Sequence, residues 1–169
     1  MAEFPNFGKP HESQRGYFAA SLYEAMVVDP DIYLVLFDLG YMVFDKHRER
    51  FPDKVINVGA SEQAGMGVAV GLAMSEKKVL TYTISSFYLR CAETLALYIA
   101  GEGTPVRMIG SGRDGDYAHD GPSHHGRNAQ NFISSLGITS YYPGDKSQVP
   151  DMVADILNTN KPSFLSLTR

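Results

Sequence analysis

The 169-residue chain contains no tryptophan and a single cysteine, Cys91. One cysteine cannot form a disulfide within the chain, and this suits a reducing compartment. No apolar run reaches the length of about 18 residues that a membrane-spanning helix needs. The first residues also lack the basic and then apolar order of a signal peptide. We therefore expect a cytoplasmic protein that does not enter a membrane.

Clustered positive charge is also lacking. The formal net charge is -4 at pH 7, and lysine and arginine form no basic run. Nucleic-acid-binding proteins usually carry a basic patch, so nucleic acid is excluded as the main ligand. The chain does contain 44% hydrophobic residues, which is ordinary for a globular domain. We expect an extended arm over residues 1–12, with Pro5 and Pro10, and one domain over residues 13–169.

Helical and strand patterns alternate along this domain. Apolar residues at helical spacing predict a helix over 13–28, with Ser13 as its N-cap. The run 32–37 is apolar throughout, as in a parallel strand buried on both faces. Further strands are predicted at 55–58, 79–84, 106–109, 139–142 and 163–167, and further helices at 45–51, 62–75, 88–100, 128–136 and 147–157. This alternation predicts an α/β fold, a three-layer α/β/α arrangement with a mostly parallel central sheet of about six strands.

Four polar segments follow predicted strands, at 38–40, 59–62, 85–90 and 110–127. Ligands of open parallel sheets bind beyond the carboxyl ends of the strands. Because these segments should share that edge of the sheet, their convergence predicts a ligand site there.

Glu62 stands where a strand is expected to turn into a helix. The helix that follows contains Gly65, Gly67 and Gly71, and each glycine costs about 1 kcal/mol relative to alanine. Such a helix suggests a close approach by another chain. Glu62 itself is either a carboxylate that complements the helix dipole or a general acid/base held by a tight turn.

Two further segments offer candidate ligands. Phe87 is either a core residue or a stacking platform for a planar ligand, and Arg90 could bind an anion or form an exposed ion pair. The loop 110–127 contains three histidines. Their spacing does not match a helical pair of zinc ligands and no cysteine joins them, so we expect no metal ligands in this chain. A polar substrate pocket is the better interpretation of the loop.

Several of these residues, in order, resemble a known family. The runs FDLGY, from Phe37, and RFPDKVINVGASEQ, from Arg50, are similar to the pyrimidine-binding domain of transketolase-like, thiamine-diphosphate-dependent enzymes. The run DGPSHH, from Asp120, is similar to the D-G-P-T-H loop of that family. The similarity extends from about Leu34 to Pro143.

The resemblance implies a role for each matching residue around the cofactor. Glu62 would bind N1′ of the aminopyrimidine ring and so activate the cofactor, and Phe87 would stack on that ring. Asp38 and Leu39 match a segment near the cofactor. Arg90 matches a position on the cofactor or substrate side.

Residues of the histidine-rich loop match the substrate side of that family. Asp120 and His124 correspond to residues that contact a sugar substrate, and His124 is also a candidate catalytic residue. His119, next to Asp120, is a candidate substrate ligand. His125 has no assigned role.

The family's other half binds diphosphate and a divalent metal through a G-D-G motif with a later asparagine, and these 169 residues contain no G-D-G. The chain also stops at Arg169, before the family's C-terminal domain. The resemblance therefore implies a split enzyme, in which a partner subunit holds the diphosphate and Mg²⁺. Two copies of each subunit would form a heterotetramer.

Three functions remain open at this point. The first is ketol transfer or carboligation on sugar phosphates or 2-oxo acids, which the histidine-rich loop favours. The second is decarboxylation of a 2-oxo acid by a split thiamine-diphosphate enzyme. The third is a non-catalytic regulatory homologue. Retention of Glu62, Phe87, Asp120 and His124 argues against the third.

Overall fold

The central sheet contains six parallel strands in the computed structural model, which describes residues 7–169. The strand order is β2-β1-β3-β4-β6-β5, and every neighbouring pair is parallel. The strands are β1 (Ile32–Leu36), β2 (Val55–Asn57), β3 (Lys78–Ile84), β4 (Val106–Ser111), β5 (Thr139–Tyr141) and β6 (Ser163–Leu167). The predicted α/β fold and number of strands are confirmed.

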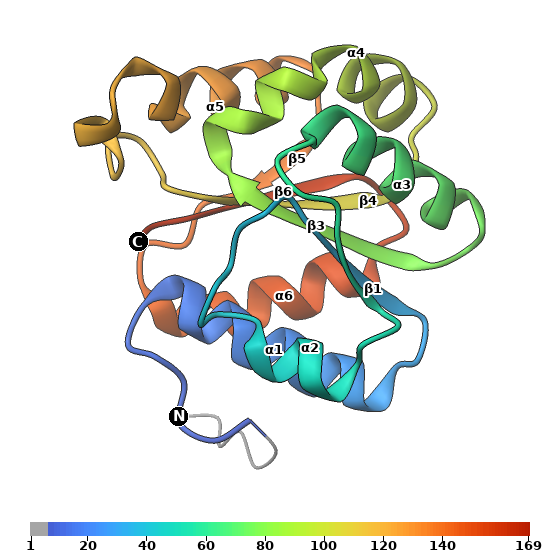
Figure 1. Cartoon of the computed structure of the whole chain (residues 1–169). Coiled ribbons are helices and arrows are strands. Elements are labelled where there is room, and N and C mark those ends of the chain that lie inside the picture. The colour runs from blue at the N-terminus through green and yellow to red at the C-terminus, as the bar shows by residue number, and fades with distance from the viewer. Residues whose placement is uncertain (1–6) are drawn as a thin grey trace.

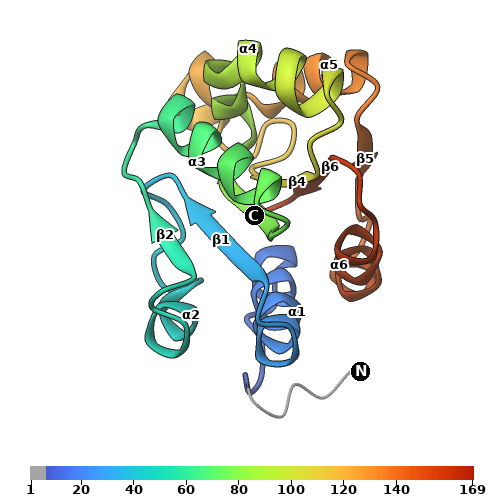
Figure 2. The same ribbon diagram turned by 90° about the vertical axis from the view of Figure 1, so that its right-hand side faces the viewer.

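Helices cover both faces of the sheet (Figure 1; Figure 2). One face carries α1 (Gln14–Val28), α2 (Asp45–Arg50) and α6 (Val149–Asn158), which follows a short 3₁₀ turn at Lys146–Gln148. The other face carries α3 (Glu62–Met74), α5 (Gly126–Ser135) and a helix of mixed geometry between β3 and β4. Each layer of helices packs its own apolar cluster against the sheet.

Helix α1 begins where the sequence predicts it. The side-chain oxygen of Ser13 accepts a hydrogen bond from the backbone N–H of Gly16 at 3.1 Å. This bond satisfies one of the free N–H groups of the first turn. Phe18 and Leu22 on this helix are fully buried against the sheet.

The helix predicted over 88–100 has a different start and a different geometry. It begins with a 3₁₀ segment η1 (Ser85–Cys91), continues through α4 (Ala92–Thr94), and ends as a π-helix η2 (Leu95–Gly101). The 3₁₀ start changes which side chains share a face, because residues three apart eclipse one another in that geometry.

The loop predicted over 110–127 is shorter than expected. Residues 110 and 111 belong to β4, and α5 begins at Gly126 instead of residue 128. Two 3₁₀ turns, η3 (Ala118–Asp120) and η4 (Pro122–His124), give the loop a defined backbone. Its candidate ligands therefore have fixed positions.

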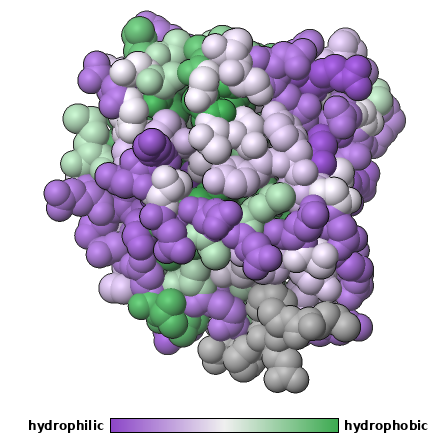
Figure 3. Space-filling view, turned by 180° about the vertical axis from the view of Figure 1, so that it is seen from behind, coloured by the Kyte–Doolittle hydropathy of each residue, from purple (hydrophilic) through white to green (hydrophobic). Residues whose placement is uncertain are grey.

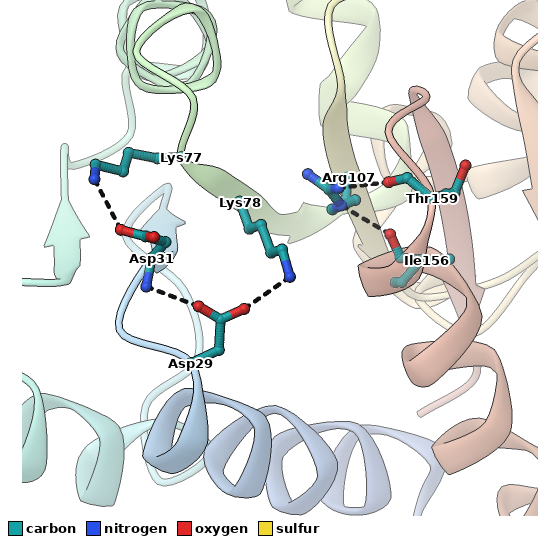
Figure 4. A network of polar contacts seen from close by, with 7 residues as sticks. All are labelled: Asp29, Asp31, Lys77, Lys78, Arg107, Ile156 and Thr159. Carbon is teal, nitrogen blue, oxygen red and sulfur yellow. Dashed lines mark hydrogen bonds and ion pairs between the residues drawn. The ribbon is translucent and has the colours of Figure 1, made fainter.

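The amino edge of the sheet is occupied by paired charges (Figure 4). Lys77 and Lys78 form ion pairs with Asp31 and Asp29, each at 2.8 Å. The buried guanidinium of Arg107 donates to the backbone oxygens of Ile156 and Thr159 at the end of α6, and burial lowers the pKa of Arg107. A cation at a helix C-terminus complements the helix dipole. These contacts occupy the charged groups at the edge opposite the predicted site.

The start of the described chain packs on α1. The backbone N–H of Phe7 donates to the Glu24 carboxylate at 3.1 Å, and the Phe7 ring meets Tyr23 edge to face at 5.4 Å. The rest of the predicted arm, residues 1–6, lies outside the described residues.

The surface is largely polar on the side turned away in Figure 1. Seen from behind, the strongest apolar colour lies near the top and at the lower left, with paler apolar residues on the left flank and across the middle (Figure 3). Within residues 7–169, no helix is both long and apolar enough to cross a membrane.

Candidate functional site

All four polar segments lie at the carboxyl edge of the sheet. Asp38 follows β1, Glu62 begins α3 after β2, η1 follows β3, and the histidine-rich loop follows β4. In a parallel sheet the carboxyl ends of the strands point the same way, so segments far apart in the sequence meet. Contacts between side chains then show which candidates share one site.

Glu62 is a buried carboxylate with a specific partner. Its side chain is 5% exposed, and it forms an ion pair with Arg90 Nη1. Ser61, the N-cap residue of α3, makes no capping bond with its side chain. Burying a carboxylate is costly unless a cation or hydrogen-bond donors meet it, and Arg90 does so here.

Phe87 and Arg90 form a stack on η1. The guanidinium carbon of Arg90 lies 4.0 Å from the centroid of the Phe87 ring. The 3₁₀ geometry explains this contact, because residues i and i+3 eclipse one another. A planar cation at this distance is attracted to the face of an aromatic ring.

His124 extends this chain of contacts toward the loop. Its ring centroid lies 5.0 Å from that of Phe87, with an interplanar angle of 70°. Ser123 Oγ lies 3.0 Å from His124 Nδ1 and orients the ring. Glu62, Arg90, Phe87 and His124 are therefore joined by successive contacts, which we call the Glu62–His124 cluster.

The other loop candidates lie apart from that cluster. Asp120 Oδ2 and His119 Nε2 are 3.3 Å apart, and both side chains are well exposed. His125 is exposed at the N-cap position of α5 and makes no side-chain capping bond. In the described part of the chain, contacts join His124 alone among the three histidines to Phe87.

Asp38 and Leu39 are held at the end of β1. Asp38 adopts a left-handed backbone conformation, with φ of 57°, which aspartate tolerates better than most residues. Its N–H donates to Asn57 Oδ1 at 3.0 Å, and the same oxygen accepts the N–H of Gly59 at 3.1 Å. Leu39 is half-buried and packs on the core beneath α1.

Asn57 is a positioning residue that the sequence analysis missed. One amide oxygen ties the turn after β1 to the turn that leads into Glu62. The signal was an amide side chain at the end of a strand and two residues before a glycine, a common way to satisfy backbone N–H groups in turns.

Two glycines at opposite ends of the histidine-rich loop serve packing. Gly112 has φ of +77°, and a Cβ there would lie 2.2 Å from the ring of Tyr117. A Cβ on Gly126 would lie 2.6 Å from the backbone oxygen of Gly112. These close approaches explain the glycines without a bound phosphate.

A cationic cavity lies beside the end of β1, between α1 and the β1–α2 loop. Its volume is about 550 Å³, and Lys9, Arg15 and Lys46 line it together with the exposed side chains of Tyr41 and Met42. Among residues 7–169, Asp45 is the one carboxylate in its lining. The cavity suits a ligand with an anionic end. The sequence analysis missed it, because its cations come from separate segments.

The described residues offer no cluster of metal ligands. Across residues 7–169, no group of three or more histidine, cysteine, aspartate or glutamate side chains could hold a metal ion. The free thiol of Cys91 is buried next to the site, and burial, followed by the nearby Glu62 carboxylate, raises its pKa to about 12. This thiol is therefore protonated at neutral pH and is a poor nucleophile.

Comparison with known proteins identifies the family. A family model described as the pyrimidine-binding domain of transketolase matches residues 13–169. The chain belongs to this family. The resemblance drawn from the sequence motifs is confirmed.

Curated relatives of this transketolase-type domain are longer proteins. The 1-deoxy-D-xylulose-5-phosphate synthase of Prochlorococcus marinus is 28% identical over 123 residues, which cover 72% of this chain and 19% of that protein. A 6-deoxy-6-sulfo-D-fructose transketolase subunit of a Clostridium species is 28% identical over 123 residues, covering 72% and 38%. The chain thus spans less than half the length of these relatives.

Solved transketolase structures share the fold of this pyrimidine-binding domain. A structure described as a split gene transketolase, inactive beta4 tetramer, has a TM-score of 0.81 at 23% identity, over 93% of this chain and 52% of that one. The transketolase of Campylobacter jejuni has a TM-score of 0.81 at 16% identity, over 98% and 28%.

The pyrimidine-binding domain has a local geometry that fits the ring of thiamine diphosphate. Glu62 supplies a buried acceptor, and Phe87 supplies an aromatic face beside it. Arg90 shows that one flat group bearing N–H donors can contact both at once. An aminopyrimidine is also flat and carries polar nitrogens.

Proposed function

We propose that this chain is the pyrimidine-binding subunit of a split, transketolase-like, thiamine-diphosphate-dependent enzyme. The enzyme would carry out ketol transfer or carboligation on sugar phosphates or 2-oxo acids. The observation that carries the proposal is the joint placement of Glu62 and Phe87 around one planar group. When bound, thiamine diphosphate supplies a carbon nucleophile and an electron sink for such reactions.

Glu62 and Phe87 would have different roles at the pyrimidine ring. Glu62 would hold a proton at N1′, and this role requires a carboxyl group at that position. Phe87 would fix the ring by stacking. The burial of Glu62 keeps water from competing for the same bond. Asn57 would hold the turns that carry Asp38 and Glu62 in register.

Substrate would be bound by the histidine-rich loop and the cationic cavity. His124 lies next to Phe87, so it can reach a group reacting near the ring. Asp120 and His119 are exposed on the same loop and could bind hydroxyl groups. Arg15 and Lys46 line the cavity where an anionic end of the substrate would sit. This cavity favours phosphorylated substrates.

A partner subunit would complete the site by binding the diphosphate and Mg²⁺ through a G-D-G motif and a later asparagine. Helix α3 offers a surface for it, with small or apolar side chains exposed at Ala64, Gly67, Val68, Gly71 and Met74. An added Cβ at Gly67 or Gly71 meets nothing within 4 Å. Two copies of each subunit would form a heterotetramer.

Gly65 does not belong to that surface. A Cβ there would lie 2.4 Å from Phe37 Cε1 and 2.6 Å from Val58 Cγ2. The expectation that all three glycines admit another chain is therefore wrong for Gly65, which lets α3 approach the sheet of its own domain.

The test is reconstitution with a partner chain that carries the G-D-G motif. The two chains should co-purify, and calorimetry should show magnesium-dependent binding of thiamine diphosphate by the complex and weak binding by this chain alone. Tight magnesium-dependent binding by the isolated chain would contradict the split site. Turnover assays with sugar phosphates and with 2-oxo acids then separate transfer from decarboxylation.

A further inference from the structure

We propose that Arg90 occupies the pyrimidine position in the free chain and must leave before the cofactor binds. The inference rests on the proposed function, because it takes Glu62 and Phe87 as the residues that hold the ring. The inference adds that the Arg90 guanidinium competes with the pyrimidine ring for that site. Arg90 is then a displaceable group that sets cofactor affinity, in contrast to the expectation that it binds the cofactor.

Arg90 already makes both contacts that the proposed function assigns to the ring. Its guanidinium pairs with the Glu62 carboxylate and lies over the face of Phe87, 4.0 Å from the ring centroid. A guanidinium is planar and presents donors along its edge. A stacked pyrimidine needs the same carboxylate and an aromatic face at the same distance, so the two groups compete.

The two members of the Glu62–Arg90 pair differ in burial. The Glu62 side chain is 5% exposed and the Arg90 side chain is 50% exposed. Glu62 therefore stays in place and needs a partner, since a buried, unpaired carboxylate is strongly unfavourable. Arg90 is the member that can move into water, because half of its side chain is already solvated, and an incoming donor must then take its place on Glu62.

Hydrogen bonds of the neighbouring residues fix the backbone on both sides of the Glu62–Arg90 pair. Gln63 Nε2, next to Glu62, donates to Thr94 Oγ1 at 2.9 Å and ties α3 to α4. Tyr88, next to Phe87, is fully buried and its hydroxyl bonds to Thr81 and Ile109. Rotation of the Arg90 side chain alone can therefore open the site while the backbone stays in place.

If Arg90 closes the site in most molecules, only the open fraction can bind the ligand. The apparent affinity is then the intrinsic affinity multiplied by that fraction. Removing the guanidinium should then tighten binding of a pyrimidine ligand. Arg90→Met keeps a long side chain but carries no charge and no donors. The matched control is Arg127→Met, since Arg127 is exposed on α5.

The experiment uses the full ¹⁵N-labelled chain and free thiamine as the probe, with NMR detection of arginine Nε–H signals. The Arg90 signal is assigned by its loss in Arg90→Met. Without thiamine it should be displaced by the ring current of Phe87, and Phe87→Leu should abolish that displacement. Added thiamine should move it to the position of a solvated arginine, with the Arg127 signal unchanged.

The dissociation constant of thiamine, read from backbone amide shifts near Glu62, provides the second measurement. Arg90→Met should lower it at least about threefold, as expected when a closed state is removed, whereas Arg127→Met should leave it unchanged. The proposal is overturned if thiamine binds with the Arg90 signal unmoved, or if Arg90→Met weakens binding. If thiamine shifts no amide near Glu62 even in Arg90→Met, Arg90 is not the group that keeps the ring out and the proposal is overturned, whereas the proposed function is decided separately by reconstitution with the partner chain.

Discussion

Glu62 and Arg90 form an ion pair across 28 residues of sequence, between the first turn of α3 and the 3₁₀ segment after β3. The pair lies at the carboxyl edge of the sheet, where the segments that follow β2 and β3 meet, although β1 lies between these two strands. The carboxylate is the buried member and the guanidinium the half-exposed one. Substitution of the two residues should therefore have different consequences.

Glu62→Gln should preserve the fold and abolish most turnover of the reconstituted enzyme. The amide has the same size, and Arg90 loses only a half-exposed ion pair. The carboxyl group that would exchange a proton with the cofactor is lost, so we expect turnover to fall by about 10²–10⁴-fold. Steady-state assays with circular dichroism measure both effects. Glu93→Gln is the control, because Glu93 is an exposed carboxylate on the neighbouring α4. Near-wild-type turnover of Glu62→Gln would reject the role given to Glu62.

His124→Ala should impair substrate turnover more than cofactor affinity. His124 contacts Phe87 at the edge of the Glu62–His124 cluster. Glu62 pairs with Arg90 without a contribution from His124. Comparing kcat and KM for substrate with the dissociation constant of thiamine diphosphate separates the two effects. His125→Ala is the control, since the neighbouring ring is exposed. Equal losses in both variants would remove His124 from the substrate site.

Gly65→Ala and Gly71→Ala should change stability in opposite directions. A Cβ at Gly65 would overlap Phe37 and Val58, so we expect the free energy of unfolding to fall by roughly 1–3 kcal/mol. A Cβ at Gly71 meets open space, and alanine should stabilise the helix by up to about 1 kcal/mol. Urea unfolding of the isolated chain measures both. Gly71→Ala should also weaken association with the partner subunit, and unchanged association would move the interface away from α3.

The stability of the chain should fall as the pH decreases from about 6.5 to about 4. His47 is buried, its Nε2 hydrogen-bonds with the backbone oxygen of Ala19, and burial lowers its pKa to about 4. The unfolded chain, with an ordinary histidine pKa, binds the proton first, so protonation favours unfolding in this window. The difference corresponds to about 3 kcal/mol. Urea titrations across this range measure it.

His47→Gln provides the comparison for that pH dependence. Glutamine can still donate to Ala19 but does not titrate, so the slope between pH 6.5 and 4 should flatten. Asp29, whose pKa the hydrogen bond from Lys78 lowers, contributes at lower pH in both proteins. Parallel pH profiles for the two proteins would show that His47 is not responsible.

The sequence predicted the layers and the edge of the sheet that carries the candidates, because those depend on periodicity. The strand around Leu34 is apolar on both faces, and its burial follows directly. Glu62 could be predicted as a site residue from the sequence, because it stands between a strand and a helix of small residues. These features are local in the sequence.

The contacts within the site were not predictable, because they depend on local geometry. With α-helical geometry Phe87 and Arg90 are only neighbours on one side of a helix, whereas the 3₁₀ segment stacks them. Gly65 and Gly71 look alike in the sequence and differ only in what their α-carbons face. Asn57 bonds to two turns that come from different strands, which no short motif reveals.

The all-parallel sheet has an electrostatic consequence for ligand binding. Helices α1, α3, α5 and α6 all begin at the carboxyl edge and end at the amino edge, where Lys77, Lys78 and Arg107 are already paired. Their aligned peptide dipoles direct positive potential toward the site, although the chain carries a net charge of -4. We expect this positive potential to stabilise anionic molecules at the open edge, and added salt should weaken the effect.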